Sequence, residues 1–241
     1  MNNLKVNLDN IRSRVASACK QAGREPAGIT ILAVSKKHPV ERIEALNRLG
    51  QASFGENYVQ EALTKMTHFT NRDITWHFIG PLQSNKTREV AQHFQWVQSV
   101  DRIKILRRLS NQRPPNLPAL NVCIQVNIDR EPQKAGVLPE QVGELVDAAR
   151  SLTRLRLRGL MTIPKTASEQ HDPSASYARM NTLFQGLIDG GLELDTLSMG
   201  MSADLEAAIM HGSTMVRIGT DLFGPRPDDG TDCYRHQRRR S

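Results

Sequence analysis

The chain has 241 residues, of which 39% are hydrophobic and 24% charged, and this composition is that of an ordinary globular protein rather than of a disordered or fibrous one. The formal net charge of +7 suits an anionic small molecule. Nucleic-acid binding is disfavoured because aromatic residues make up only 5% of the chain, and none alternate with arginines as a base-stacking platform requires.

Nothing in the sequence indicates export, a membrane or a metal. The N-terminal segment MNNLKVNLDN is polar and lacks the apolar run and cleavage site of a signal peptide. No apolar stretch approaches the length of a membrane span. The three cysteines show no paired spacing and the seven histidines no metal-ligand spacing. We therefore expect a cytoplasmic protein with no membrane partner, no disulfide framework and no metal.

The predicted elements begin with an amphipathic helix over residues 3–22, which Gly23 ends. Short apolar runs then alternate with charged, helix-like stretches. The eight runs span residues 29–34, 52–55, 74–80, 96–100, 119–127, 155–163, 195–200 and 214–219. The candidate helices between them span residues 39–50, 58–66, 86–94, 101–109, 138–152, 175–190 and 202–212.

Strands that alternate with helices predict a parallel sheet, because each return crossover uses a helix. Eight such units in one domain-sized chain favour an α/β fold with a single (β/α)8 TIM barrel and an extra N-terminal helix. An open, doubly wound sheet is the alternative. We assign residues 1–225 to the barrel and residues 226–241, which end in HQRRRS, to a basic, disordered tail.

Lys36 is the sharpest candidate residue. Functional groups of such barrels gather at the carboxyl ends of the strands, and Lys36 follows the first apolar run. Alternation along a strand puts it on the face of Leu32 and Val34. A lysine in apolar surroundings is poorly hydrated, which lowers its pKa and frees the amine to attack an aldehyde. A solvated lysine just past a strand is the alternative.

The ends of the seventh and eighth runs predict a phosphate site, because barrels often bind phosphate there. Glycines let a phosphate approach backbone N–H groups, and hydroxyl side chains add donors. The alternative is ordinary loop chemistry, with Ser202 as a helix N-cap. The candidate residues are Met199, Gly200, Met201, Ser202, Arg217, Gly219 and Thr220.

Two further polar residues are candidates for the same mouth. Asn57 and His77 each follow or occupy an apolar run, although such residues are more often satisfied polar groups of loops and cores. Arg217 shares a strand face with Met215 and Gly219 and needs an acceptor at that depth. A buried ion pair with a core acid is its alternative role. Met199 and Met201 could pack on a flat ring or fill the core.

At these residues the chain resembles the pyridoxal phosphate homeostasis protein family, single-domain relatives of the alanine racemase N-terminal barrel. The matching segments are AVSK (33–36), FGENYVQE (54–61), WHFIGPLQSNK (76–86), RLRGLMTIP (156–164), SMGMSADLEAAI (198–209) and GSTMVRIGTDLFG (212–224). The resemblance departs at Lys37, where a small hydroxyl residue is common. It departs again at residues 130–136 (REPQKAG), which leaves the role of Lys134 open.

The resemblance implies that pyridoxal 5′-phosphate (PLP) is held as a Schiff base on Lys36. It implies that Ser202, Gly219 and Thr220 hold the phosphate and that Arg217 faces the pyridine nitrogen. The implied role is intracellular PLP homeostasis and amino-acid/keto-acid balance, with PLP-dependent apoenzymes as recipients. We expect a monomer without a nucleic-acid partner.

The alternative within the same fold is a PLP enzyme of fold type III with weak racemase-like activity. Racemisation needs acid–base groups on both faces of a carbanion, and the related racemases take the second from a separate domain and a partner subunit. An arginine beside the ring nitrogen also makes the ring a weak electron sink. We therefore expect a non-catalytic carrier. A Schiff-base aldolase, and a basic tail that binds nucleic acid with strong salt dependence, are the remaining alternatives.

Overall fold

The computed structural model describes residues 2–69, 73–165 and 172–224. The basic tail predicted at residues 226–241 lies outside the described residues, so its assignment and the boundary at 225 remain predictions.

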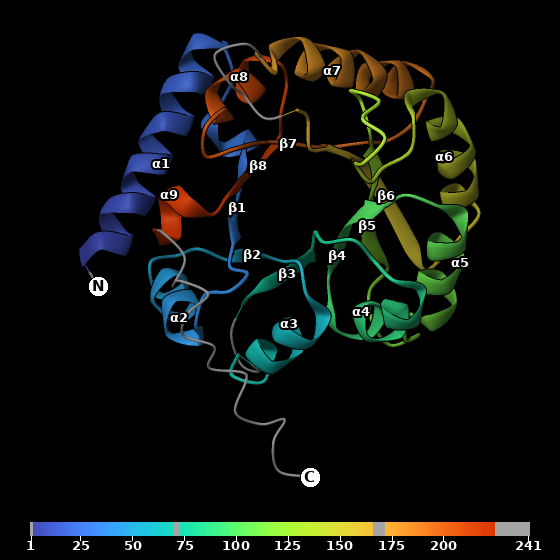
Figure 1. Cartoon of the computed structure of the whole chain (residues 1–241), viewed down its shortest axis with the longest axis horizontal. Coiled ribbons are helices and arrows are strands. Elements are labelled where there is room, and N and C mark those ends of the chain that lie inside the picture. The colour runs from blue at the N-terminus through green and yellow to red at the C-terminus, as the bar shows by residue number, and fades with distance from the viewer. Residues whose placement is uncertain (1, 70–72, 166–171, 225–241) are drawn as a thin grey trace.

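Eight parallel strands close into a barrel in the order of the chain, from β1 to β8 and back to β1 (Figure 1). The strands are β1 (Thr30–Val34), β2 (Ser53–Glu56), β3 (Thr75–Phe78), β4 (Trp96–Val100), β5 (Leu120–Val126), β6 (Leu155–Thr162), β7 (Thr196–Met201) and β8 (Met215–Ile218). Each lies within or overlaps one of the eight apolar runs. The predicted (β/α)8 barrel is therefore confirmed, and the open sheet is excluded.

Helices ring the barrel, as Figure 1 shows. The α-helices are α1 (Asn2–Gln21), α2 (Val40–Arg48), α3 (Val59–Met66), α4 (Thr87–His93), α5 (Ile103–Gln112), α6 (Val142–Arg150), α7 (Ser174–Asp189), α8 (Leu205–Met210) and α9 (Thr220–Phe223). Three short 3-10 helices are η1 (Pro26–Gly28), η2 (Ser84–Lys86) and η3 (Pro139–Gln141). The N-terminal helix is present as predicted, whereas α9 was not predicted.

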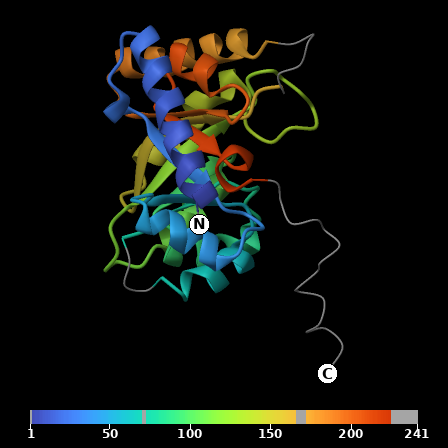
Figure 2. The same cartoon turned by 90° about the vertical axis from the view of Figure 1, so that its left-hand side faces the viewer.

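Two glycines explain where the first helices end. Gly23 and Gly50 have positive φ angles of 64° and 87° and follow α1 and α2. A left-handed residue at this place reverses the chain after a helix, and glycine adopts it without a steric cost. Helix α1 lies across the outside of the barrel beside α8 and α9 (Figure 2), and one face of it is buried there through Leu8, Ile11 and Val15.

The main hydrophobic cluster fills the space between the strands and the surrounding helices. The barrel interior is different, because a second, small cluster of Trp96, Cys123 and Met161 lies there together with buried polar side chains such as Gln98 and Arg217. No helix in the described part of the chain combines the length and apolarity needed to cross a membrane. Polar side chains therefore lie inside the barrel, and the functional groups of such barrels gather at the carboxyl-terminal ends of the strands.

Candidate functional site

Lys36 lies in a turn two residues beyond the end of β1. The ladder continues as far as Ser35, whose N–H donates to Gly55 O at 3.0 Å. The Ser35 side chain points behind the sheet, where its hydroxyl donates to Glu56 Oε1 at 2.6 Å. Lys36 follows in the turn, and the residue is half-buried. The turn is sharp, since the following residue, Lys37, has a φ of 62°.

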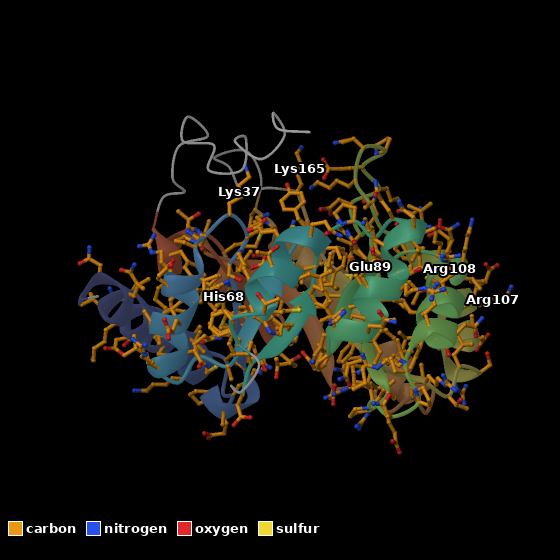
Figure 3. All side chains as sticks on the ribbon, turned by 90° about the horizontal axis from the view of Figure 1, so that it is seen from below. Lys37, His68, Glu89, Arg107, Arg108 and Lys165 are labelled. Carbon is orange, nitrogen blue, oxygen red and sulfur yellow. The ribbon has the colours of Figure 1, made fainter. Side chains whose placement is uncertain are left out.

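The mouth of the barrel brings this turn beside the last two strand ends. Ala33 of β1 pairs with Ile218 of β8, and a Cβ placed on Gly219 would lie 3.7 Å from Val34 Cβ. Lys36 follows Val34 by two residues, so its turn neighbours the loop after β8. Figure 3 shows the adjacent Lys37 at the same end of the molecule as Lys165, which follows β6.

The loops after β7 and β8 retain donors that no described residue uses. The hydroxyls of Ser202 and Thr220 and the backbone N–H of Gly219 make no hydrogen bond within the described part of the chain. Ser202 is not a helix N-cap, because α8 begins three residues later, at Leu205, with Asp204 as its N-cap residue. These groups are therefore available to an anion at the mouth.

The end of β7 approaches α8 so closely that only glycine fits at one position. Gly200 has a φ of 94°, and a Cβ there would lie 2.5 Å from Ala208 Cβ. Asp204 holds the loop from the other side, since its Oδ1 accepts from Met201 N–H at 2.6 Å. The loop geometry is thus set by glycine and by a turn, which explains why the helix starts later than the sequence predicts.

Arg217 is buried inside the barrel, with 5% of the residue exposed. Its Nη1 donates to both the carbonyl and the hydroxyl oxygen of Ser198 at 2.8 Å, and its Nη2 donates to Thr162 O at 2.7 Å. These acceptors are neutral, so within the described residues the guanidinium has no carboxylate in contact, unlike the ion pair that the sequence left open. Burial lowers the pKa of Arg217, and its unused N–H groups remain for a further acceptor.

A hydrogen-bonded chain fixes Arg217 and runs from it across the barrel interior. Ser198 Oγ accepts from Arg217 and donates to Gln98 Oε1 at 2.6 Å, and Gln98 Nε2 lies 2.9 Å from His77 Nδ1. Arginine has no acceptor, so every bond must point away from it and His77 Nδ1 must accept. Sequence reasoning missed Gln98 and Ser198, because nothing local marks a polar residue inside a barrel.

His77 lies in the interior of the barrel rather than at its mouth. The ring is fully enclosed and stacks on Trp96, with centroids 5.0 Å apart and an interplanar angle of 15°. Burial lowers the pKa of His77 to about 3, so the ring is neutral near pH 7. His77 is therefore a buried hydrogen-bond acceptor, which is the alternative that the sequence left open as a satisfied polar group of the core.

Asn57 stands at the mouth with an unused acceptor. Its Oδ1 is buried and has no hydrogen-bond partner within the described residues, a state that usually marks a missing ligand or water. Gly80, after β3, packs closely on Asn57, because a Cβ there would lie 2.2 Å from Asn57 O.

The two candidate methionines differ in burial. Met199 is fully buried in the main hydrophobic cluster, which favours a role in core packing, whereas Met201 is half-buried.

A buried ionic cluster that the sequence did not reveal lies behind the Lys36 turn. Lys65 of α3 donates to Glu56 Oε1 at 2.8 Å, to Ser35 O at 2.7 Å and to Glu61 Oε1 at 2.7 Å. The backbone N–H of Lys37 also donates to Glu61, at 2.5 Å. Burial raises the pKa of Glu56 against the effect of Lys65. The cluster therefore anchors both residues that flank Lys36.

The unusual segment at residues 130–136 packs over the end of β6. Lys134 Nζ donates to Pro164 O at 2.8 Å and pairs with Glu131. A cavity of about 460 Å³ opens beside this segment. The residues that line it are Ile128, Asp129, Arg130, Glu131, Lys165 and Arg179. Lys134 is thus engaged in holding its loop to the barrel.

Comparison with known proteins assigns the family. Residues 6–227 match the model of the alanine racemase N-terminal domain. The chain is 51% identical over 226 residues to a pyridoxal phosphate homeostasis protein of Pseudomonas aeruginosa. The aligned region covers 94% of this chain and 97% of that protein. The chain belongs to the family of pyridoxal phosphate homeostasis proteins. The family resemblance seen in the sequence is thereby confirmed.

Solved structures of similar proteins agree with this assignment. One is PipY of Synechococcus elongatus PCC7942, solved with PLP bound, which has 36% sequence identity to this chain and a TM-score of 0.78. The matched region spans 89% of this chain and 100% of the PipY chain. An alanine racemase of Clostridium difficile 630 has 17% identity and a TM-score of 0.76 and covers 95% of this chain and 58% of its own. At that identity the racemase shows a shared fold alone.

Proposed function

We propose that this protein binds PLP covalently as a Schiff base on Lys36 and acts in PLP homeostasis and in amino-acid/keto-acid balance. The observation that carries the proposal is the position of the Lys36 turn, beside the loop after β8. Two strand ends there offer unused hydroxyl and N–H donors. The name of the Pseudomonas relative and the PLP bound to PipY support the same reading.

The residues at the mouth fit this cofactor. Ser202, Gly219 and Thr220 would hold the phosphate, since small loops with free N–H and hydroxyl donors suit an oxyanion. Arg217 would face the ring nitrogen as a donor, and the unpartnered Asn57 Oδ1 would accept from a polar substituent. When bound, PLP supplies an aldehyde that an amine captures reversibly.

Replacing Lys36 is the direct test. We expect the purified protein to be yellow, and borohydride to fix the cofactor onto a peptide that contains Lys36. Lys36→Ala is expected to abolish both the colour and the labelled peptide, because no other amine takes the same place. Lys37→Asn is the matched control: it removes the neighbouring ammonium but keeps a residue that tolerates the φ of 62°. Colour that persists in Lys36→Ala would refute the covalent assignment.

We propose further that the protein is a carrier and not an efficient enzyme. The guanidinium of Arg217 is held by Ser198 and Thr162 and always carries its charge. A ring nitrogen that faces it stays unprotonated and withdraws electrons weakly. We therefore expect incubation with L-alanine to yield D-alanine no faster than free PLP does, measured by chiral chromatography. Rapid D-alanine formation that Lys36→Ala abolishes would favour the racemase-like alternative.

We propose that the protein acts as a cytoplasmic monomer that delivers PLP to PLP-dependent apoenzymes. Cys19 and Cys123 are buried free thiols, which suits a reducing compartment. The monomer is supported by the small number of large hydrophobic side chains exposed among the described residues, which come from four separate parts of the chain. They are Val6, Tyr58, Ile163 and Met210.

A further inference from the structure

One arginine of the N-terminal helix bridges the two loops at the mouth. Arg14 Nη2 donates to Ser202 O at 2.8 Å and to Glu206 Oε2 at 2.9 Å, and its Nε donates to Glu206 Oε1 at 2.6 Å. Its Nη1 donates to Asp221 Oδ2 at 2.7 Å. Ser202 belongs to the loop after β7, and Asp221 to the first turn after β8. A single planar guanidinium therefore fixes the spacing of the two loops.

The helix that carries Arg14 is itself fixed against the barrel. Helix α1 packs on α8 and α9 (Figure 2), and Asn7 Nδ2 donates to Leu222 O of α9 at 3.0 Å. The Arg14 side chain is only 32% exposed. A planar fork that meets a carboxylate through two N–H groups fixes direction as well as distance. The helix outside the eight βα units thus holds both loops in place.

The bridge also balances charge. Glu206 and Asp221 lie beside the Ser202 loop and the Thr220 turn, with side chains 44% and 40% exposed. Two carboxylates at this place repel a dianionic phosphate, and partial exposure weakens but does not remove that repulsion. Arg14 contacts both of them. Its hydrogen bonds lower the pKa of Glu206, so Arg14 favours the ionised form of this carboxylate and compensates its charge.

We propose that Arg14 is a positioning residue for the phosphate of the cofactor, and that through it the N-terminal helix sets the preference of this site for phosphorylated over unphosphorylated pyridoxal. Arg14 acts by fixing the spacing of the Ser202 and Thr220 loops and by neutralising Glu206 and Asp221. The inference rests on the proposed binding of PLP, but not on the bond to Lys36.

The test measures the dissociation constants of PLP and of pyridoxal by equilibrium dialysis of the full-length protein. Arg14→Ala is expected to weaken PLP binding about tenfold, which corresponds to about 1.4 kcal/mol, and to leave pyridoxal binding unchanged. Arg14→Lys keeps a charge but loses the fork, so we expect an intermediate loss for PLP. Arg12→Ala is the matched control, because Arg12 lies on the same helix and contacts Leu49 O and Asp9 instead.

Three outcomes overturn the inference: unchanged PLP affinity in Arg14→Ala, an equal loss for PLP and pyridoxal, or the same loss of PLP affinity in Arg12→Ala. The melting temperature of each variant is measured alongside, and Arg14→Lys decides the question if Arg14→Ala does not fold. Failure of the proposed function looks different, since the unaltered protein would then not retain PLP in the dialysis at all.

Discussion

Replacing Lys65 with methionine is expected to lower the free energy of unfolding by about 3–5 kcal/mol, the usual cost of removing one partner of a buried ion pair. The Lys65 and Glu56 side chains are 5% and 0% exposed, and their charged atoms are 2.8 Å apart. Glu56 Oε2 already has no partner within the described residues. Methionine fills the space of the lysine stem, so the loss would come from the stranded carboxylate rather than from a cavity.

Two controls isolate that carboxylate. Lys65→Met combined with Glu56→Gln is expected to recover most of the loss, because the fully buried charge is then gone, while Glu61 is partly exposed and keeps the N–H of Lys37. Lys5→Met breaks the Lys5–Asp9 pair, whose side chains are 65% and 49% exposed, and is expected to cost less than about 1 kcal/mol. Urea unfolding at pH 7 measures all of them. A cost for Lys65→Met no larger than that for Lys5→Met would contradict the expectation.

The same cluster bears on the candidate site. Lys65 donates to the carbonyl of Ser35, and Glu61 accepts from the N–H of Lys37, so the residues on both sides of Lys36 are tied to α3. A turn that is sharp at Lys37, with a positive φ, needs such support to persist. The cluster of Lys65, Glu56 and Glu61 therefore also supports the geometry of the turn.

The eight strands could be predicted because a parallel strand is buried on both faces and appears in the sequence as a nearly continuous apolar run. The strand ends could be selected because function gathers there in a barrel. This reasoning placed Lys36 and the segments at residues 199–202 and 217–220 at one mouth, and their individual roles remain predictions. It could not place α9, which is a single turn of helix, or the late start of α8.

The partners of the site residues could not be predicted, because each lies far away in the sequence. Arg14 reaches Ser202 across 188 positions, and Ser198 reaches Gln98 across 100. Locally, Arg14 is one of several basic residues on an amphipathic helix, and Lys65 resembles a solvated residue at a helix end. Only the closure of the barrel and the packing of α1 decide which polar group meets which. Site residues could thus be proposed from strand ends, but not the groups that hold them.

Lowering the pH below neutrality is expected to destabilise the protein through His77. Burial lowers the pKa of this ring from its ordinary 6.5 to about 3. Below pH 6.5 the histidine of the unfolded chain binds a proton, whereas His77 in the folded chain stays neutral down to about pH 3. The contribution of His77 to the free energy of unfolding is therefore complete above pH 6.5 and is lost as the pH falls from 6.5 to about 3. The slope is about 1.4 kcal/mol per pH unit, and the whole window amounts to about 5 kcal/mol.

The free energy of unfolding is measured from pH 7 to pH 4 for the unaltered protein and for His77→Phe, and the two values are subtracted at each pH. Phenylalanine keeps a ring on Trp96 but does not titrate, so it shifts stability by a constant and removes the slope. His93→Gln, at an exposed position at the end of α4, is the control and is expected to keep the slope. A difference between His77→Phe and the unaltered protein that does not vary with pH would refute the assignment.

The His77 chain gives this acid sensitivity a functional consequence. A proton on Nδ1 turns the acceptor of Gln98 Nε2 into a donor, and two donors then face each other at 2.9 Å. Relief requires the Gln98 amide to turn over, which presents N–H₂ to Ser198 Oγ, the group that also receives Arg217 Nη1. Arg217 cannot reverse its own bonds because it has no acceptor. Ser198 Oγ then accepts from both Gln98 and Arg217 and loses Gln98 Oε1 as its own acceptor, so acid is expected to rearrange the hydrogen bonds around Arg217, and His77→Phe to abolish that rearrangement.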